Sequence, residues 1–193
     1  MITDKYLIWQ YNRGHRQALH QIYERYKDQL VTLAAALLSD RDVCEDIVHD
    51  VFIGFIRSEG KFQLTGSLRS YLSTCVANRA KNRNKAERRR CYTPLEGIPS
   101  PIARAGDPAV LAMCGELSDS LSRALDQLPY EQREVLALRT YGGMTFAAIA
   151  AQQETSVYTV QGRYRYALDK LRKLLTETRN QESRAHLRLH HGT

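Results

Sequence analysis

The chain has 193 residues, of which 43% are hydrophobic and 25% charged, and this is the composition of an ordinary globular protein. Its longest apolar run, from Leu33 to Leu38, is far too short to cross a bilayer, so we expect no membrane insertion. The first residues are polar and lack the apolar core of a signal peptide. We therefore expect a cytoplasmic protein with one domain or two small ones.

The N-terminal half is predicted to be helical throughout. Apolar residues recur at helical spacing over 5–12, 19–38 and 43–56, and Ser67 is a favourable N-cap for a fourth helix. Residues 39–42 interrupt the pattern and offer N-caps for the third helix. This half shows no strand-like alternation and no hairpin turn pair, so we expect an all-α fold.

Positive charge is concentrated in one stretch of the chain. The net charge is +7, and eight of the 28 basic residues lie between Arg69 and Arg90, against one of the 21 acidic residues. The rest of the chain is therefore neutral. A single basic block on a balanced chain favours a polyanion such as nucleic acid as the partner. A solvated helix face is the alternative for the block taken by itself.

Residues 93–115 differ from the segments on either side. They contain four of the five prolines and show no helical period until about Pro108. We interpret them as a flexible linker of 23 residues. Fully extended, such a linker reaches roughly 75–80 Å. Two modules on successive turns of duplex DNA are separated by about 34 Å, which is well within that reach.

The C-terminal half also shows helical patterns. Leucines recur at helical spacing from Leu117 to Leu128, and Pro129 is suited to the first position of the next helix. The Gly142–Gly143 pair is expected to end that helix as a C-cap. Residues 177–193 are polar, and we expect this tail to fray.

The stretch from Met144 to Leu175 has the pattern of a helix-turn-helix. Thr145 caps a short apolar-periodic segment, the pattern breaks over 152–155, and Ser156 caps a longer one. In this motif the first turns of the second helix enter the major groove. Here those turns offer groups that can hydrogen-bond base edges, on Ser156, Tyr158, Thr159, Gln161 and Arg163. Two ordinary core helices with a solvated face are the alternative.

Two sets of motifs occur in a fixed order. The N-terminal set comprises Asp42–Phe52, Gly66–Leu72 and Ala77–Arg79. The C-terminal set comprises Leu128–Arg133, Leu138–Arg139, Gly142, Met144–Phe146 with Ile149–Ala150, Ser156 with Thr159–Val160 and Arg163, and Ala167–Arg172. Together they resemble a bacterial sigma factor of the extracytoplasmic-function (ECF) type, within the sigma-70 family, over about residues 15 to 175.

The resemblance implies two small helical domains and a function in transcription. A sigma region 2 helical bundle is expected in 1–92, the linker in 93–115, a region 4 helix-turn-helix domain in 116–176 and the flexible tail in 177–193. The implied function is to direct core RNA polymerase to specific promoters and to help open them. A stand-alone helix-turn-helix regulator that acts without polymerase is the alternative. We expect no enzyme activity, no catalytic residues, no metal site and no cofactor.

The resemblance also implies three groups of site residues. Contact with the clamp helices of core polymerase is expected from Asp46, His49 and Asp50. Binding of the minus-ten promoter element and melted DNA is expected from Phe62, Tyr71, Asn78, Arg79, Lys81 and Arg83. Reading of the minus-thirty-five element is expected from Ser156, Tyr158, Thr159, Gln161, Gly162 and Arg163, while the apolar side of that domain meets the polymerase flap. An anti-sigma factor is a further possible partner.

The sequence departs from the family pattern at several places, and two of these departures change what we expect of the turn and of the clamp contact. The break of the helix-turn-helix usually holds a glycine and then an apolar residue, but here it holds Glu154 and Thr155. Because glycine is absent, we expect a different backbone turn. The family usually has glutamine where this chain has His49, so we expect the clamp contact to differ or to weaken at low pH.

Overall fold

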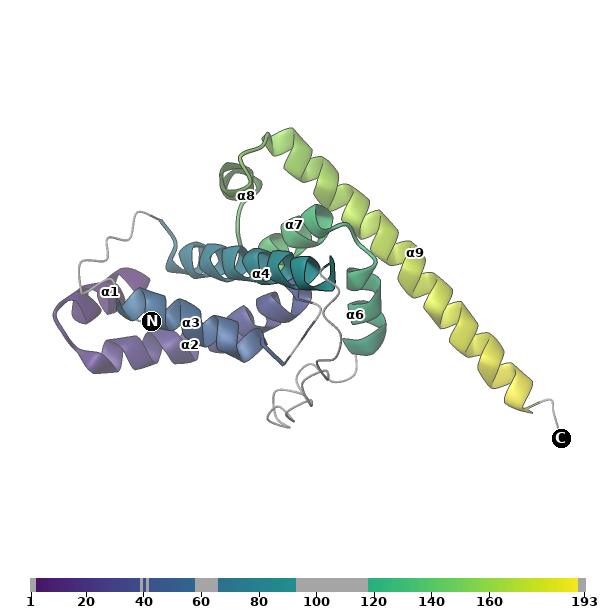
Figure 1. The fold of residues 1–193 in the computed structure, drawn as a ribbon, viewed down its shortest axis with the longest axis horizontal. Coiled ribbons are helices and arrows are strands. Elements are labelled where there is room, and N and C mark those ends of the chain that lie inside the picture. Colours follow the sequence, from purple (N-terminus) through teal and green to yellow (C-terminus); the bar gives the residue numbers. More distant parts are fainter. Residues whose placement is uncertain (1–2, 39, 41, 58–65, 93–117, 191–193) are drawn as a thin grey trace.

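All of the secondary structure in the described part of the chain is helical. The structure, a computed structural model, describes residues 3–38, 40, 42–57, 66–92 and 118–190, which form eight helices and no strand (Figure 1). The all-α fold class predicted from the sequence is confirmed. Phe62 and the predicted linker over 93–115 lie outside the described residues.

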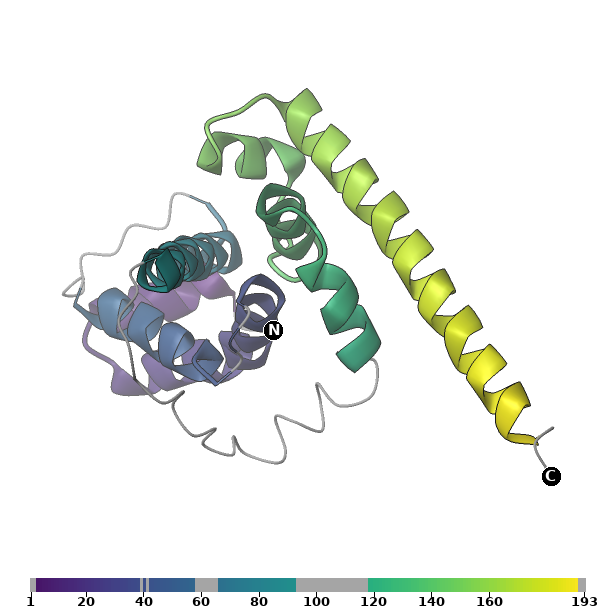
Figure 2. The ribbon, with the colours of Figure 1, turned by 45° about the vertical axis from the view of Figure 1, so that its right-hand side comes forward.

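The first four helices form a bundle. They are α1 (Asp4–Asn12), α2 (Arg16–Leu37), α3 (Cys44–Ile56) and α4 (Leu68–Tyr92). α2 packs against α1, α3 and α4, and Figure 2 shows α4 end-on beside the other three. The apolar stripes predicted from the sequence supply the buried centre, which includes Ile22, Leu30, Val48, Phe55 and Leu72.

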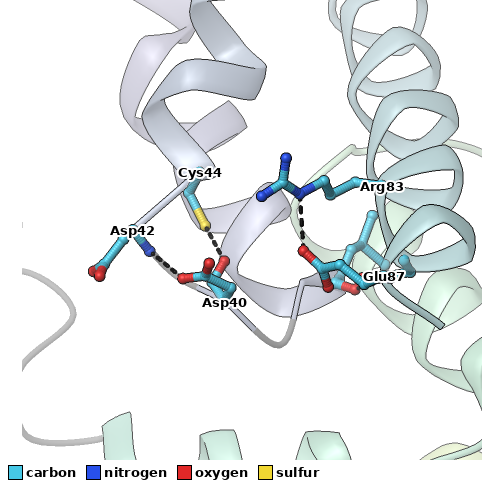
Figure 3. Close-up of polar contacts among 7 residues, drawn as sticks. Asp40, Asp42, Cys44, Arg83 and Glu87 are labelled. Atoms are coloured by element: carbon cyan, nitrogen blue, oxygen red, sulfur yellow. Dashed lines mark hydrogen bonds and ion pairs between the residues drawn. The ribbon is translucent and has the colours of Figure 1, made fainter. Parts of the chain in front are cut away.

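The start of α3 differs from the prediction. Its N-cap is Val43, which makes no side-chain cap bond, whereas the caps were expected among residues 39–42, which directly precede it. There the Asp42 N–H donates to Asp40 Oδ1 at 3.1 Å, and the Cys44 thiol lies 4.0 Å from the Asp40 carbonyl oxygen (Figure 3). Asp40 therefore closes a local Asx-type turn before the helix, because its short side chain reaches the N–H two residues ahead.

The second group of helices comprises α6 (Ser118–Asp126), α7 (Tyr130–Thr140), α8 (Phe146–Gln152) and α9 (Val157–His190). Pro129 is the N-cap of α7, one position before the predicted one. After α7, Gly143 has a φ of +62°, a left-handed conformation that glycine adopts without strain, and the predicted glycine stop is confirmed. A small core joins α6, α7 and α9 through Ala124, Leu128, Leu136, Ala167 and Leu171.

The last helix is longer than the sequence analysis expected. α9 continues to His190 instead of fraying after residue 176, and its C-terminal part projects away from the other helices (Figures 1 and 2). Residues 177–190 contain neither glycine nor proline and are rich in helix-favouring glutamate, glutamine, arginine and leucine, so their propensity supports the continuation. None of the described helices combines the length and the apolar character needed to cross a membrane.

The two groups of helices pack directly against each other. Leu138 of α7 and Ile149 of α8 belong to the same buried core as the first bundle, and α7 contacts both α2 and α4 (Figure 2). Arg69 of α4 donates from Nη2 to the Tyr141 carbonyl oxygen at 2.8 Å. A Cβ added to Gly143 would lie 2.7 Å from Cζ of the same guanidinium, so another residue at this position would displace the Arg69 side chain. The helices form one packed body in this arrangement.

Candidate nucleic-acid interface

The helix-turn-helix begins with a capped short helix and a strained turn. The Thr145 hydroxyl accepts from the Ala148 N–H at 3.1 Å, which confirms the predicted N-cap of α8. At the other end of α8 the Thr155 N–H donates to the Ala150 carbonyl oxygen at 3.0 Å. Glu154 has a φ of +50° between these helices. The left-handed turn that usually takes glycine is therefore formed with glutamate, rather than replaced by another turn.

The N-terminal turns of α9 present a polar, exposed face. Ser156 Oγ accepts from the Thr159 N–H at 3.1 Å, so Ser156 caps the helix as predicted. Tyr158 is 86% exposed, whereas Val160 is fully buried. The predicted reading residues that lie on the exposed side are Ser156, Tyr158, Thr159 and Gln161, while Gly162 and Arg163 are half-buried. The structure thus brings the predicted group together on one short segment.

Arg163 is connected by hydrogen bonds to two residues that the sequence analysis did not identify, Gln153 and Glu134. Its Nη1 donates to Gln153 Oε1 at 2.8 Å, and Gln153 Nε2 donates to Glu134 Oε2 at 2.7 Å. Glu134 belongs to α7, Gln153 follows the last residue of α8, and Arg163 belongs to α9. The three side chains form a polar relay, named here the Glu134–Gln153–Arg163 relay, that joins all three helices.

Glu134 is a buried carboxylate. It is 3% exposed, and burial raises its pKa, while the nearby Lys81, Gln153 and Arg163 act in the opposite direction. One signal in the sequence points to this residue. Glu134 lies four residues from Tyr130 and from Leu138, so it interrupts the apolar face of α7. No comparable local signal marks Gln153, because its role depends on how α8 and α9 are packed.

The basic block lies along α4, where Arg69 is half-buried and the cations from Arg79 to Arg89 are exposed. Asn78, Arg79, Lys81 and Arg83 are all on the surface, and Tyr71 is 39% exposed. Burial of the remainder of the Tyr71 ring raises the pKa of its hydroxyl, which stays neutral near pH 7. Arg83 donates from Nε to Glu87 Oε1 at 2.8 Å, one turn along the same helix (Figure 3).

The predicted polymerase contacts on α3 are divided between two hollows. Asp46 and Asp50 line a cleft of about 320 Å³ between α3 and α4, which also receives Arg79 and Arg83. His49 lines a separate groove of about 340 Å³ between α2 and α3, where its ring meets the edge of Tyr23 at 6.3 Å between ring centroids. The three residues are all exposed, and their spacing of three and four residues places them on one side of α3, between the two hollows.

One ion pair joins the two groups of predicted residues. Arg79 Nη1 donates to Asp50 Oδ2 at 3.2 Å, and Arg79 Nη2 donates to the Asp50 carbonyl oxygen at 3.0 Å. A residue predicted to contact DNA is thus bonded to one predicted to contact polymerase. Such an exposed pair contributes little to stability, so a phosphate or another protein can replace either partner at small cost.

Comparisons with known proteins match both halves of the chain. The family model described as Sigma-70 region 2 matches residues 22–90, and the one described as Sigma-70, region 4 matches residues 124–173. The chain is 28% identical over 171 residues to the ECF RNA polymerase sigma factor SigK of Mycobacterium ulcerans, covering 88% of this chain and 91% of that protein. It is 26% identical over 170 residues to the ECF RNA polymerase sigma-E factor of Escherichia coli strain K12, covering 84% of this chain and 88% of that protein. The chain belongs to the ECF group of the sigma-70 family.

This ECF sigma factor also shares its fold with a solved structure. The sigma factor RpoE of Bartonella quintana, in complex with the anti-sigma factor NepR, superposes with a TM-score of 0.63 at 23% identity, covering 81% of this chain and 96% of that chain. The chain is an RNA polymerase sigma factor, and its family consists of transcription initiation factors rather than enzymes. A stand-alone regulator is the less favoured reading.

Proposed function

We propose that this sigma factor divides promoter recognition between its two groups of helices. The acidic side of α3, with Asp46 and Asp50, binds the clamp helices of core polymerase. The exposed cations of α4 hold the minus-ten element and the melted strand. The N-terminal turns of α9 read the minus-thirty-five element in the major groove. The protein itself catalyses no reaction and acts in the cytoplasm, where polymerase and promoter meet.

One observation carries this proposal. A capped helix start with a polar exposed face and a cationic helix occur in the same chain, on helices that match the two sigma domains. Cations along α4 attract phosphates in a salt-dependent way that does not depend on base sequence. The side chains at the start of α9 have the length and the donors needed to reach base edges. Specificity and general affinity are thus assigned to different helices.

Reading of both elements at once is proposed to involve opening of the packed arrangement. α7 lies against α2 and α4, so the two DNA-binding faces are held on one body. Promoter elements that lie on separate turns of the duplex are about 34 Å or more apart. The segment between Tyr92 and Ser118 has enough residues to span that distance when it is extended.

An anti-sigma factor is the partner that we propose for the packed arrangement. The fold neighbour RpoE is in complex with the anti-sigma factor NepR. A protein that binds the packed form and not the open one shifts the population toward the packed form. Transcription from the target promoters would then require removal of that partner.

The contact with polymerase can be tested by charge reversal. Replacing Asp46 and Asp50 together by lysine should reduce co-purification with core polymerase, because two attractive contacts become repulsive. The matched control replaces Glu24 and Asp28, which are exposed at the same spacing on α2. Unchanged co-purification of the α3 variant would remove these residues from the polymerase contact.

Base reading can be tested at Arg163. Arg163→Ala should relax the base preference within the upstream element by about 1–3 kcal/mol at one position, because a bidentate contact is lost. The profile is measured with the holoenzyme on a pool of randomised duplexes. An unaltered profile would exclude Arg163 as a reading residue.

A further inference from the structure

We propose that Glu134 and Gln153 are positioning residues that set the direction in which Arg163 faces the promoter. This inference rests on the proposed reading role of the start of α9. It adds two residues from outside the recognition helix to the machinery of promoter specificity. Neither residue belongs to the face that meets DNA, so both act through Arg163.

The chemistry of the relay fixes its orientation. A carboxylate only accepts hydrogen bonds and a guanidinium only donates them, whereas the amide of Gln153 has one acceptor and one donor end. Glu134 therefore holds the Gln153 NH₂ group at 2.7 Å, and the amide oxygen is left to face Arg163 at 2.8 Å. Turning the amide over would place like groups against each other at both ends. The relay thus has one stable polarity.

Burial makes this orientation rigid. Glu134 is 3% exposed and Gln153 and Arg163 are half-buried, so water competes weakly for their hydrogen bonds. Removing one member leaves a buried polar group without its partner, which is costly. A guanidinium has five N–H donors, so a bond to Gln153 leaves donors for a base edge. Arg163 is therefore fixed through its bond to Gln153, and its remaining N–H donors are available to a base edge.

The relay is also attached to the strained turn. Gln153 immediately precedes Glu154, whose φ of +50° disfavours a residue with a side chain. The Glu134 contact ties this turn to α7, and the Arg163 contact ties it to α9. A shift of Gln153 therefore changes the angle of the recognition helix and the direction of Arg163 together.

The experiment compares five variants of the full chain in the holoenzyme. Base preference is measured by sequencing the duplexes bound from a fully randomised pool. Gln153→Ala removes the centre of the relay and should flatten the preference at the base position that Arg163→Ala also flattens, by at least about fivefold. Glu24→Gln, on the exposed side of α2, is the control and should leave the profile unchanged.

A polarity swap separates positioning from simple support of the fold. Gln153→Glu places two carboxylates in contact and should flatten the profile at least as strongly as Gln153→Ala. The double variant with Glu134→Gln and Gln153→Glu restores a donor opposite an acceptor at both links. It should recover most of the wild-type profile. The midpoint of thermal unfolding is measured for each variant. A positioning role requires the base profile to change with the donor and acceptor pattern of the relay and not with the unfolding midpoint.

Each outcome supports or overturns a particular claim. An unchanged profile in Gln153→Ala, or a double variant no better than Gln153→Glu, overturns the positioning role. If Gln153→Glu fails to fold, Gln153→Ala and the double variant decide between the outcomes. If Arg163→Ala itself leaves the profile intact, the proposed reading role fails, and the relay is then a structural contact. A profile changed by Arg163→Ala but not by Gln153→Ala rejects only this inference.

Discussion

The two halves of the molecule hold the cations that we propose bind DNA in different ways. On α4, Arg79 pairs with Asp50 through side chains that are 42% and 60% exposed. At the start of α9, Arg163 is connected through Gln153 to a carboxylate that is 3% exposed. Exposed pairs exchange readily for phosphate, whereas buried contacts fix geometry. In the proposed division of roles, the exposed cations of the first half attract nucleic acid by charge, and the second half contributes a side chain held in a fixed direction.

The largest effect is expected where the two halves share a core. Leu138→Ala should lower the free energy of unfolding by about 2–5 kcal/mol, because a fully buried side chain is replaced by a cavity. Leu171 belongs to the smaller core and is 8% exposed, so Leu171→Ala should cost less. Urea unfolding of both variants measures the difference. Equal costs would show that the shared core is no tighter than the local one.

The contact between the halves is expected to be the next most sensitive. Arg69→Ala removes the bond to the Tyr141 carbonyl oxygen and should weaken the packing of the halves by about 1–3 kcal/mol. Small-angle scattering should then show a larger radius of gyration. Arg88→Ala, an exposed cation on the same helix, is the control. The same radius of gyration in the wild type, Arg69→Ala and Arg88→Ala would contradict the assigned role of Arg69.

Local features of this fold could be predicted from the sequence, but contacts between distant residues could not. The caps at Thr145 and Ser156 depend on neighbours within three residues, so sequence spacing was sufficient. The pairing of Arg79 with Asp50 depends on how α3 and α4 cross, which spacing does not encode. The same holds for Arg69 and Tyr141, because they come from different halves of the chain.

The errors of the sequence analysis also have physical causes. α9 was expected to end near residue 176 because the apolar stripe ends there, but helix propensity alone carries it to His190. The missing glycine at Glu154 was expected to change the turn. Instead the surrounding contacts hold glutamate in the left-handed conformation. The sequence analysis also missed Glu134 and Gln153, which support Arg163 through hydrogen bonds. The functional roles of those residues stay predictions.

A smaller effect should reveal the strain in the second half. Glu154→Gly should raise the free energy of unfolding by about 0.5–1 kcal/mol, because relief of the left-handed strain outweighs the added freedom of the unfolded chain. Glu131→Gly, within α7, should change stability in the opposite direction. Urea midpoints of the two variants provide the test. Destabilisation by Glu154→Gly would mean that the turn is not strained.

The smallest effect is expected from the exposed pairs of the first half. Glu87→Ala removes the partner of Arg83 and should change stability by only about 0.3–0.5 kcal/mol. The same variant should strengthen binding to DNA at low salt, because a competing negative charge is gone. Stability is measured by urea unfolding and DNA binding by titration at two salt concentrations. A stability loss above about 1 kcal/mol would show that α4 pairs are structural.

The most direct test of the account is transcription in a purified system. Core RNA polymerase is supplied with a library of genomic fragments, with and without this protein, and transcript start sites are mapped. The account predicts new start sites that share two sequence elements at a fixed spacing and that appear only when the protein is present. Identical start sites in the two reactions would contradict it.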